Sequence, residues 1–175
     1  MKQDNSNPTR DLIVKRIIDA PVERVWQAWT DPEQVKHWWG PEDFSSSLCK
    51  IDLRVGGAYV FAMQAPAEQG GGVSYTTGTY TEIVPLEKLE FTQGLGDEKG
   101  NRIDPESIGM SDFPKEIRTV VTFEAIKHDM TRLTITEYDW TISGSGRMFV
   151  YALAGLHQTA DKLTKYAEGK GKRNV

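Results

Sequence analysis

The stretch LIVKRIIDAPVERVWQAWTDPEQVKHWWGP, residues 12–41, decides the fold. Its first residues are mostly aliphatic and β-branched, which predicts a strand that stops before Pro21, since proline is favoured as the first residue of a helix. In residues 22–30 the apolar side chains recur every three or four positions, so a short amphipathic helix follows. Asp31 and Pro32 have the residue types of an N-cap and a first helical position, which predicts a second short helix.

The rest of the chain changes its hydrophobic period twice. Residues 44–139 alternate with a period of two between glycine, proline and aspartate turns, which predicts a run of antiparallel hairpins. The segment 94–113 is a long loop, and because loops of that length are uncommon unless functional or disordered, it is a candidate lid. Helical spacing returns after residue 146 and runs to about Glu168. This order predicts an α+β fold, with a curved antiparallel sheet around one long C-terminal helix.

The 175 residues suit one domain. We predict a single domain over residues 11–168, a disordered N-terminal tail over 1–10 and a flexible C-terminal tail over 169–175. The first ten residues lack the apolar stretch of a secretory signal, and no run of about 18 apolar residues occurs. The only cysteine, Cys49, cannot form an internal disulfide. We therefore expect a cytoplasmic protein without stable membrane insertion, either a monomer or a homodimer.

Composition and motifs argue against several classes of function. A formal net charge of -4 and a pI near 5.4 disfavour nucleic acid as a partner, since such binding depends on clustered Lys and Arg. The histidines His37, His128 and His157 have no spacing typical of metal ligands, so no metal site is expected. Gly94-Leu95-Gly96 lacks the spacing and the following helix of a dinucleotide loop. No cofactor is expected.

Alternation in the strands and helical spacing near the C-terminus point one set of side chains into a common volume. Its apolar members, which we predict to contact a ligand, are Tyr59, Phe61, Met63, Phe91, Val121, Phe123, Leu133, Ile135, Met148, Ala152 and Leu156. Gln93 and Glu137 are the predicted polar members. The alternative is that these side chains fill the space and leave no cavity, because protein interiors are close-packed.

Charged residues on inward faces leave two interpretations open. Glu137 continues the alternation of the strand before it, and Arg16 shares a face with two aliphatic residues. We favour the interpretation that both lie near the ends of the sheet and reach water. The other interpretation is that Arg16, Glu137 or Gln93 orients a ligand in an otherwise apolar pocket. The Trp38-Trp39 pair is interpreted as core packing, with a ligand-stacking platform as the alternative.

A series of short motifs also connects the chain to a known family. The motifs are Ala20-Pro21 with Val25-Trp26, Asp31-Pro32, Trp38-Trp39-Gly40-Pro41, Leu53-Arg54-Val55-Gly56-Gly57, Lys88-Leu89-Glu90-Phe91-Thr92 and Thr119-Val120-Val121-Thr122-Phe123-Glu124. In this order they resemble the activator of heat-shock-protein ATPase homologue family, within the START-like (SRPBCC) superfamily. The resemblance covers residues 12–167 and implies the helix-grip fold of START-like and Bet v 1-like proteins, with a hydrophobic cavity between the sheet and the last helix.

The resemblance also implies a range of functions. Members of the superfamily bind lipids, sterols, polyketides and plant hormones, and some are cyclases or dehydratases. We therefore expect a non-enzymatic binder of a small apolar, lipid- or polyketide-like molecule. A cyclase or dehydratase with Glu137 or Arg16 in a chemical role is one alternative, and a chaperone-linked or regulatory interaction module is the other. Two inward titratable groups facing one cavity would favour the enzyme.

One departure from the family pattern affects the pocket. The chain has Gly155-Leu156 where the family usually carries Gly-Trp in the last helix. The resemblance therefore implies a roomier pocket, because a large indole is missing from the cavity wall.

Overall fold

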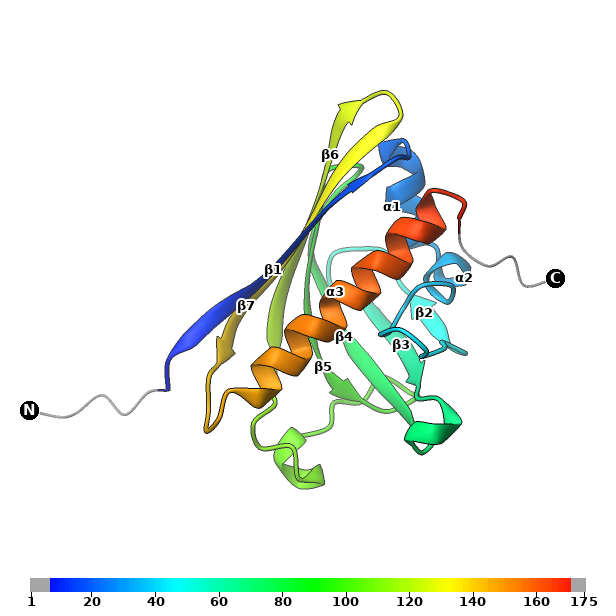
Figure 1. Cartoon of the computed structure of the whole chain (residues 1–175). Coiled ribbons are helices and arrows are strands. Elements are labelled where there is room, and N and C mark those ends of the chain that lie inside the picture. Colours follow the sequence, from blue (N-terminus) through cyan, green and yellow to red (C-terminus); the bar gives the residue numbers. More distant parts are fainter. Residues whose placement is uncertain (1–6, 171–175) are drawn as a thin grey trace, which may run out of the picture.

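The computed structural model describes residues 7–170, which form one seven-stranded antiparallel sheet and three α-helices (Figure 1). In chain order the elements are β1 (Thr9–Ile18), α1 (Val22–Thr30), α2 (Pro32–Val35), β2 (Cys49–Ile51), β3 (Ala58–Gln64), the 3-10 turn η1 (Ala67–Gln69), β4 (Val73–Val84), β5 (Lys88–Gly96), the 3-10 turn η2 (Pro105–Ile108), β6 (Ile117–Lys127), β7 (Met130–Thr141) and α3 (Arg147–Ala167). The strand order is β1-β7-β6-β5-β4-β3-β2. The predicted helix-grip fold is confirmed.

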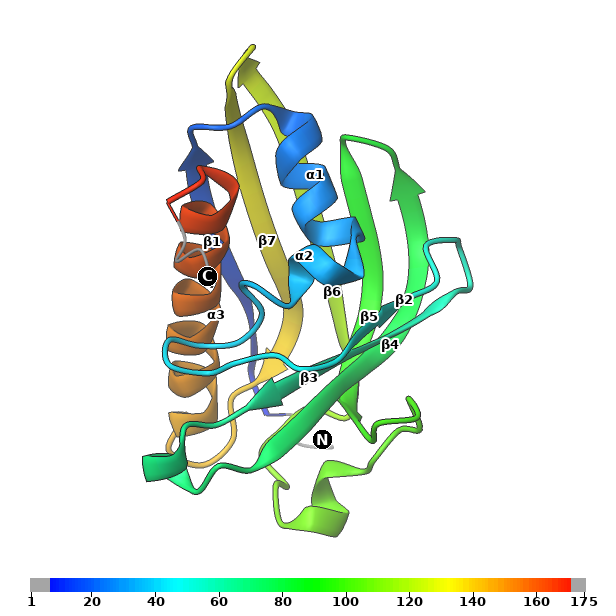
Figure 2. The same cartoon turned by 90° about the vertical axis from the view of Figure 1, so that its right-hand side faces the viewer.

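The sheet curves around the helices. In Figure 1 the long α3 lies diagonally across one face of the sheet, and Figure 2 shows that α1 and α2 lie on that same concave side. Helix α3 contacts β1 and α1, and α1 also contacts β6 and β7. No helix among the described residues is long and apolar enough to cross a membrane.

The turn from β1 into the helices follows the sequence signals in part. Pro21 is the N-cap of α1, and the Asp31 side chain caps α2 by accepting a 2.9 Å hydrogen bond from the Glu33 amide. The predicted second helix is short: α2 ends at Val35. The Trp38 indole donates a 2.9 Å hydrogen bond to the carbonyl of Ala28 in α1. This bond holds the turn that follows α2 against α1.

Two predicted boundaries differ from the structure. Strand β1 begins at Thr9, which pairs with Thr141 of β7, so the predicted start of the domain at residue 11 is late. The predicted loop 94–113 begins too early, because Gly94 and Leu95 pair with β4 and the loop proper starts after Gly96. The parts of the predicted tails in residues 1–6 and 171–175 lie outside the described residues.

The apolar core has two parts on the concave side. The larger one surrounds α1 and the middle of the sheet, and it includes Trp29 and Phe91. The smaller one contains Leu12, Ile117 and Trp140, and the first turns of α3 pack against it. Leu156 of α3 contacts both parts. The space between them is therefore bounded by the sheet on one side and by α3 on the other.

Candidate functional site

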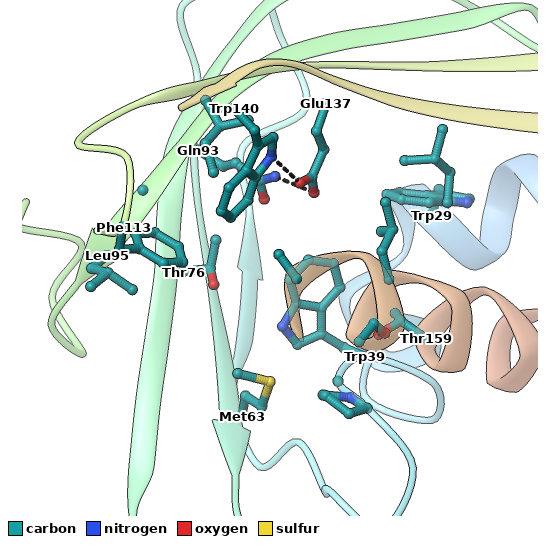
Figure 3. Close-up of a pocket in the computed structure, with 18 residues that line it drawn as sticks. Trp29, Trp39, Met63, Thr76, Gln93, Leu95, Phe113, Glu137, Trp140 and Thr159 are labelled. Atoms are coloured by element: carbon teal, nitrogen blue, oxygen red, sulfur yellow. Dashed lines mark hydrogen bonds between the residues drawn. The ribbon is translucent and has the colours of Figure 1, made fainter. Parts of the chain in front are cut away.

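A partly open cavity of about 170 Å³ lies where the two parts of the core meet, between the sheet and α3 (Figure 3). Its walls are mainly apolar and aromatic. They are formed by Trp29, Trp39, Gly40, Pro41, Met63, Thr76, Gln93, Gly94, Leu95, Phe113, Ile117, Ile135, Glu137, Trp140, Ala152, Gly155, Leu156 and Thr159. The side chains do not fill this space, so the interpretation of a completely packed interior is wrong.

Part of the predicted ligand-contacting set lines the cavity. These residues are Met63, Gln93, Ile135, Glu137, Ala152 and Leu156. Of the others, Tyr59, Phe61, Phe91, Val121, Phe123 and Leu133 lie in the larger core, and Met148 packs against the smaller one. For Tyr59, Phe61 and Phe91 the reason is aromatic packing: the Tyr59 ring centre is 4.8 Å from that of Phe61 and 5.5 Å from that of Phe91. An inward face thus places a side chain in the core, not necessarily at the cavity.

Trp140 is a wall residue that alternation does not predict, since alternation from Glu137 would turn Asp139 inward. Arg10 pairs with Trp140 and Leu12 with Glu137, so β7 has one more residue than β1 between the two pairs. Asp139 has a φ of 57°. This β-bulge places Trp140 on the same face as Glu137. No feature of the sequence marks the bulge.

Glu137 is buried, with 8% of its surface exposed, and its two oxygens accept hydrogen bonds from neutral groups. Gln93 Nε2 donates to Oε1 at 2.6 Å, and Trp140 Nε1 donates to Oε2 at 2.9 Å. Gln93 Nε2 also donates to Thr119 Oγ1 at 3.0 Å. Burial raises the pKa of Glu137, although both hydrogen bonds oppose that shift. The interpretation that Glu137 reaches water is therefore wrong.

Arg16 is not part of the cavity wall. It faces α3 from β1, where its Nε donates to Asp161 Oδ1 at 2.8 Å and one of its terminal nitrogens to the backbone carbonyl of His157 at 3.2 Å. Its side chain is 21% exposed. Arg16 thus joins the first strand to the last helix at the margin of the sheet, away from Glu137.

The Trp38-Trp39 pair divides between the two interpretations. Trp38 is fully buried core, whereas Trp39 lines the cavity and packs edge-on against Phe61, with ring centres 4.9 Å apart. The indole nitrogens of Trp39 and of Trp29 are buried without a hydrogen-bond partner among the described residues. In Figure 3 the nitrogen of Trp39 lies on the side of its ring that faces Thr76. A hydrogen-bond acceptor on a bound molecule would satisfy the Trp39 indole N–H.

Lys162 of α3 holds the backbone at the same wall. Its Nζ donates hydrogen bonds to the carbonyl oxygens of Gly40, Pro41 and Phe44, at 3.2, 3.1 and 3.0 Å. Burial lowers the pKa of Lys162. Since Gly40 and Pro41 line the cavity, Lys162 fixes one wall from the helix.

The long loop after β5 contributes Phe113. Its ring lies 5.5 Å from that of Trp140, and Ser143 Oγ donates to Asp112 Oδ1 at 2.7 Å, which ties the loop to the start of α3. The predicted lid segment therefore supplies part of the wall. Whether it opens stays a prediction.

The described residues contain no cluster of histidine, cysteine, aspartate and glutamate that could hold a metal ion. Glu137 is the sole titratable residue in the cavity wall as described. The site can therefore surround an apolar molecule and offer it one carboxylate.

Comparison with known proteins agrees with this architecture. A sequence model of the family described as Activator of Hsp90 ATPase homolog 1-like protein matches residues 19–168. Similar solved structures include a protein from Chromobacterium violaceum (26% identity, TM-score 0.68, 90% of this chain and 96% of that one), one from Arthrobacter aurescens (23%, 0.75, 91% and 86%) and the AHSA1 protein from Silicibacter pomeroyi (21%, 0.65, 89% and 95%). Among curated proteins, none matches at a significant level.

Proposed function

The chain belongs to the family of Activator of Hsp90 ATPase homolog 1-like proteins, and we propose that it binds a small apolar molecule in the cavity between the sheet and α3. The observation that carries the proposal is the cavity itself, which is walled by aromatic and aliphatic side chains around one buried carboxylate. Ligand sites in proteins have this composition, with a few polar groups that fix orientation in an apolar pocket.

The volume limits the size of the ligand. An engineered apolar cavity of about 150 Å³ stays dry and binds benzene, and the cavity here measures about 170 Å³. Pockets for drug-sized ligands are larger, at roughly 300–1,000 Å³. We therefore narrow the expected lipid- or polyketide-like ligand to a molecule of about one ring or a short chain. Burying six carbons at about 0.8 kcal/mol each supports an affinity between millimolar and micromolar.

The titratable groups support binding over catalysis. Within the described part of the chain, Glu137 is the single titratable residue that lines the cavity, whereas Arg16, the second group considered for chemistry, bonds to α3 outside it. Acid-base catalysis usually needs two groups of different protonation state at the reacting atoms. Neither a cyclase or dehydratase activity nor a chaperone-linked role has a comparable observation in its favour. The cytoplasmic location and the monomeric or homodimeric state stay predictions.

Native mass spectrometry of the freshly purified protein tests this function, followed by organic extraction of any mass that is lost on denaturation. We expect a retained small apolar molecule, or, if purification removes it, thermal stabilisation by toluene and similar one-ring compounds. Leu156→Trp, which places an indole in the cavity wall, is the matched variant and should neither retain nor be stabilised by these molecules. Absence of both adduct and stabilisation in the wild type would overturn the proposal.

A further inference from the structure

Among residues 7–170, no lysine, arginine or histidine pairs with the Glu137 carboxylate. Its hydrogen-bond donors are the Gln93 amide and the Trp140 indole, both neutral, and it is 8% exposed. A buried charge is costly unless it is paired, which is why buried carboxylates usually lie beside a cation. The arrangement provides hydrogen bonds for the carboxylate and leaves its charge uncompensated.

Free acceptors surround the same position. A carboxylate offers about four lone-pair sites, and the protein uses one on each oxygen. Gln93 directs its Nε2 to Glu137 and Thr119, which fixes the orientation of the amide. No hydrogen bond reaches Gln93 Oε1 from residues 7–170, and Figure 3 shows that oxygen on the side toward the cavity. A bound group with several N–H donors would match these acceptors.

The cavity walls also favour a cation. Trp29, Trp39, Phe113 and Trp140 all line the space. The faces of aromatic rings attract ammonium groups through their quadrupole, most strongly where water is excluded. The net charge of -4 further favours the approach of cations over anions.

We propose that the ligand of this cavity is a small amine: an apolar or aromatic body with a protonated nitrogen that pairs with Glu137 and donates to Gln93 Oε1. The inference rests on the proposed function and names the chemical class of its ligand. The ammonium supplies the positive charge that residues 7–170 do not place beside Glu137. The body of the ligand occupies the apolar remainder of the cavity.

Three one-ring probes of similar size test the inference: benzylamine, benzyl alcohol and toluene. Their affinities are measured by calorimetry and by the emission of the tryptophans in the wall. In the wild type we expect benzylamine to bind about tenfold or more tightly than toluene, as is typical of a charge-assisted hydrogen bond. Benzyl alcohol, with a single neutral donor, should lie between them.

Glu137→Gln keeps the shape of the side chain and removes its charge. In this variant the preference for benzylamine over toluene should disappear, so that the two affinities differ by less than about twofold. Glu124→Gln, which removes an exposed carboxylate elsewhere on the sheet, makes the same change in net charge and should leave the preference intact. Near-ultraviolet circular dichroism verifies that each variant is folded.

The outcomes separate the two proposals. If no probe binds to the wild type, the cavity is not a ligand site and the proposed function fails. If toluene binds and benzylamine binds no more tightly, the cavity is a site but the amine inference is wrong. Because this comparison uses the wild-type protein, it is decisive even if Glu137→Gln does not fold. A benzylamine preference that survives in folded Glu137→Gln would also overturn the assignment to Glu137.

Discussion

Glu137 on β7 accepts a 2.6 Å hydrogen bond from Gln93 on β5, across the intervening strand β6. The register explains the contact, since Thr119 of β6 lies opposite Glu137 and also accepts a hydrogen bond from Gln93. Three adjacent strands thus hold the carboxylate in place. Local rules against burying a charge are broken most often at functional sites, and this relationship is the basis of the predictions on stability.

Glu137→Gln is expected to gain stability relative to the wild type as the pH rises. Burial raises the pKa of Glu137, so over some pH range the folded state keeps a proton that the unfolded state has released. The free energy of unfolding of the wild type therefore falls from about pH 4, where an ordinary glutamate titrates, up to the folded-state pKa, and is not regained above it. Glutamine has no such proton.

Urea unfolding of both proteins between about pH 4 and pH 8 measures the effect. Glu124→Gln, at an exposed position, is the control and should show little of it. A constant difference between Glu137→Gln and the wild type across this range would contradict the prediction.

Gln93→Leu should lower the free energy of unfolding by about 1–3 kcal/mol near pH 8, because it removes the donor to a buried carboxylate and leaves that oxygen unsatisfied. The double variant Gln93→Leu/Glu137→Gln should be more stable than Gln93→Leu alone, since the uncompensated charge is gone. A double-mutant cycle from urea unfolding gives the coupling between the two residues. Strict additivity would show that the bond does not contribute.

The sequence predicts the fold better than the cavity wall, for physical reasons. Hydrophobic periods depend on local geometry, so residues 22–30 and the final helix are found from spacing alone. Whether an inward residue meets another side chain or empty space depends on packing between distant elements. Tyr59 is in the core for that reason, and Trp140 reaches the wall only through a bulge that a period of two does not predict.

Glu137 itself shows both the use and the limit of alternation. The pattern predicts its inward direction, but the favoured interpretation that it reaches water fails, because the neutral partners that bury it come from β5 and the bulge. For the Trp38-Trp39 pair, the favoured interpretation of core packing holds for Trp38, whereas Trp39 lines the cavity, and the residue types alone do not distinguish the two indoles.

Lys162→Met is expected to loosen the wall formed by Gly40 and Pro41. The variant removes a donor shared by three partly buried backbone carbonyls, and the loss of these hydrogen bonds should cost about 1–3 kcal/mol of stability in total. Relative to the wild type, amide hydrogen exchange in residues 40–44 should become faster, whereas exchange in β6 should stay the same. Lys165→Met, an exposed lysine of the same helix, is the matched control. Unchanged exchange in residues 40–44 would show that Lys162 does not hold this wall.

Leu156→Trp distinguishes a hollow site from a packed one. In a filled core, overpacking costs about 1–3 kcal/mol because side chains and backbone must shift. Leu156 borders the cavity, so an indole there has space to enter, and we expect the melting temperature to stay the same or to rise. Toluene binding should weaken at least about tenfold, because the indole occupies the volume that the ligand needs.

Val150→Trp adds the same indole to the exposed face of α3, where the valine is 62% exposed, and should leave both the melting temperature and toluene binding unchanged. A strongly destabilised Leu156→Trp would mean that the space between sheet and helix is not open in solution. A stable variant that still binds toluene would mean that the ligand occupies another place. Only the combination of retained stability and lost binding agrees with a ligand cavity at this position.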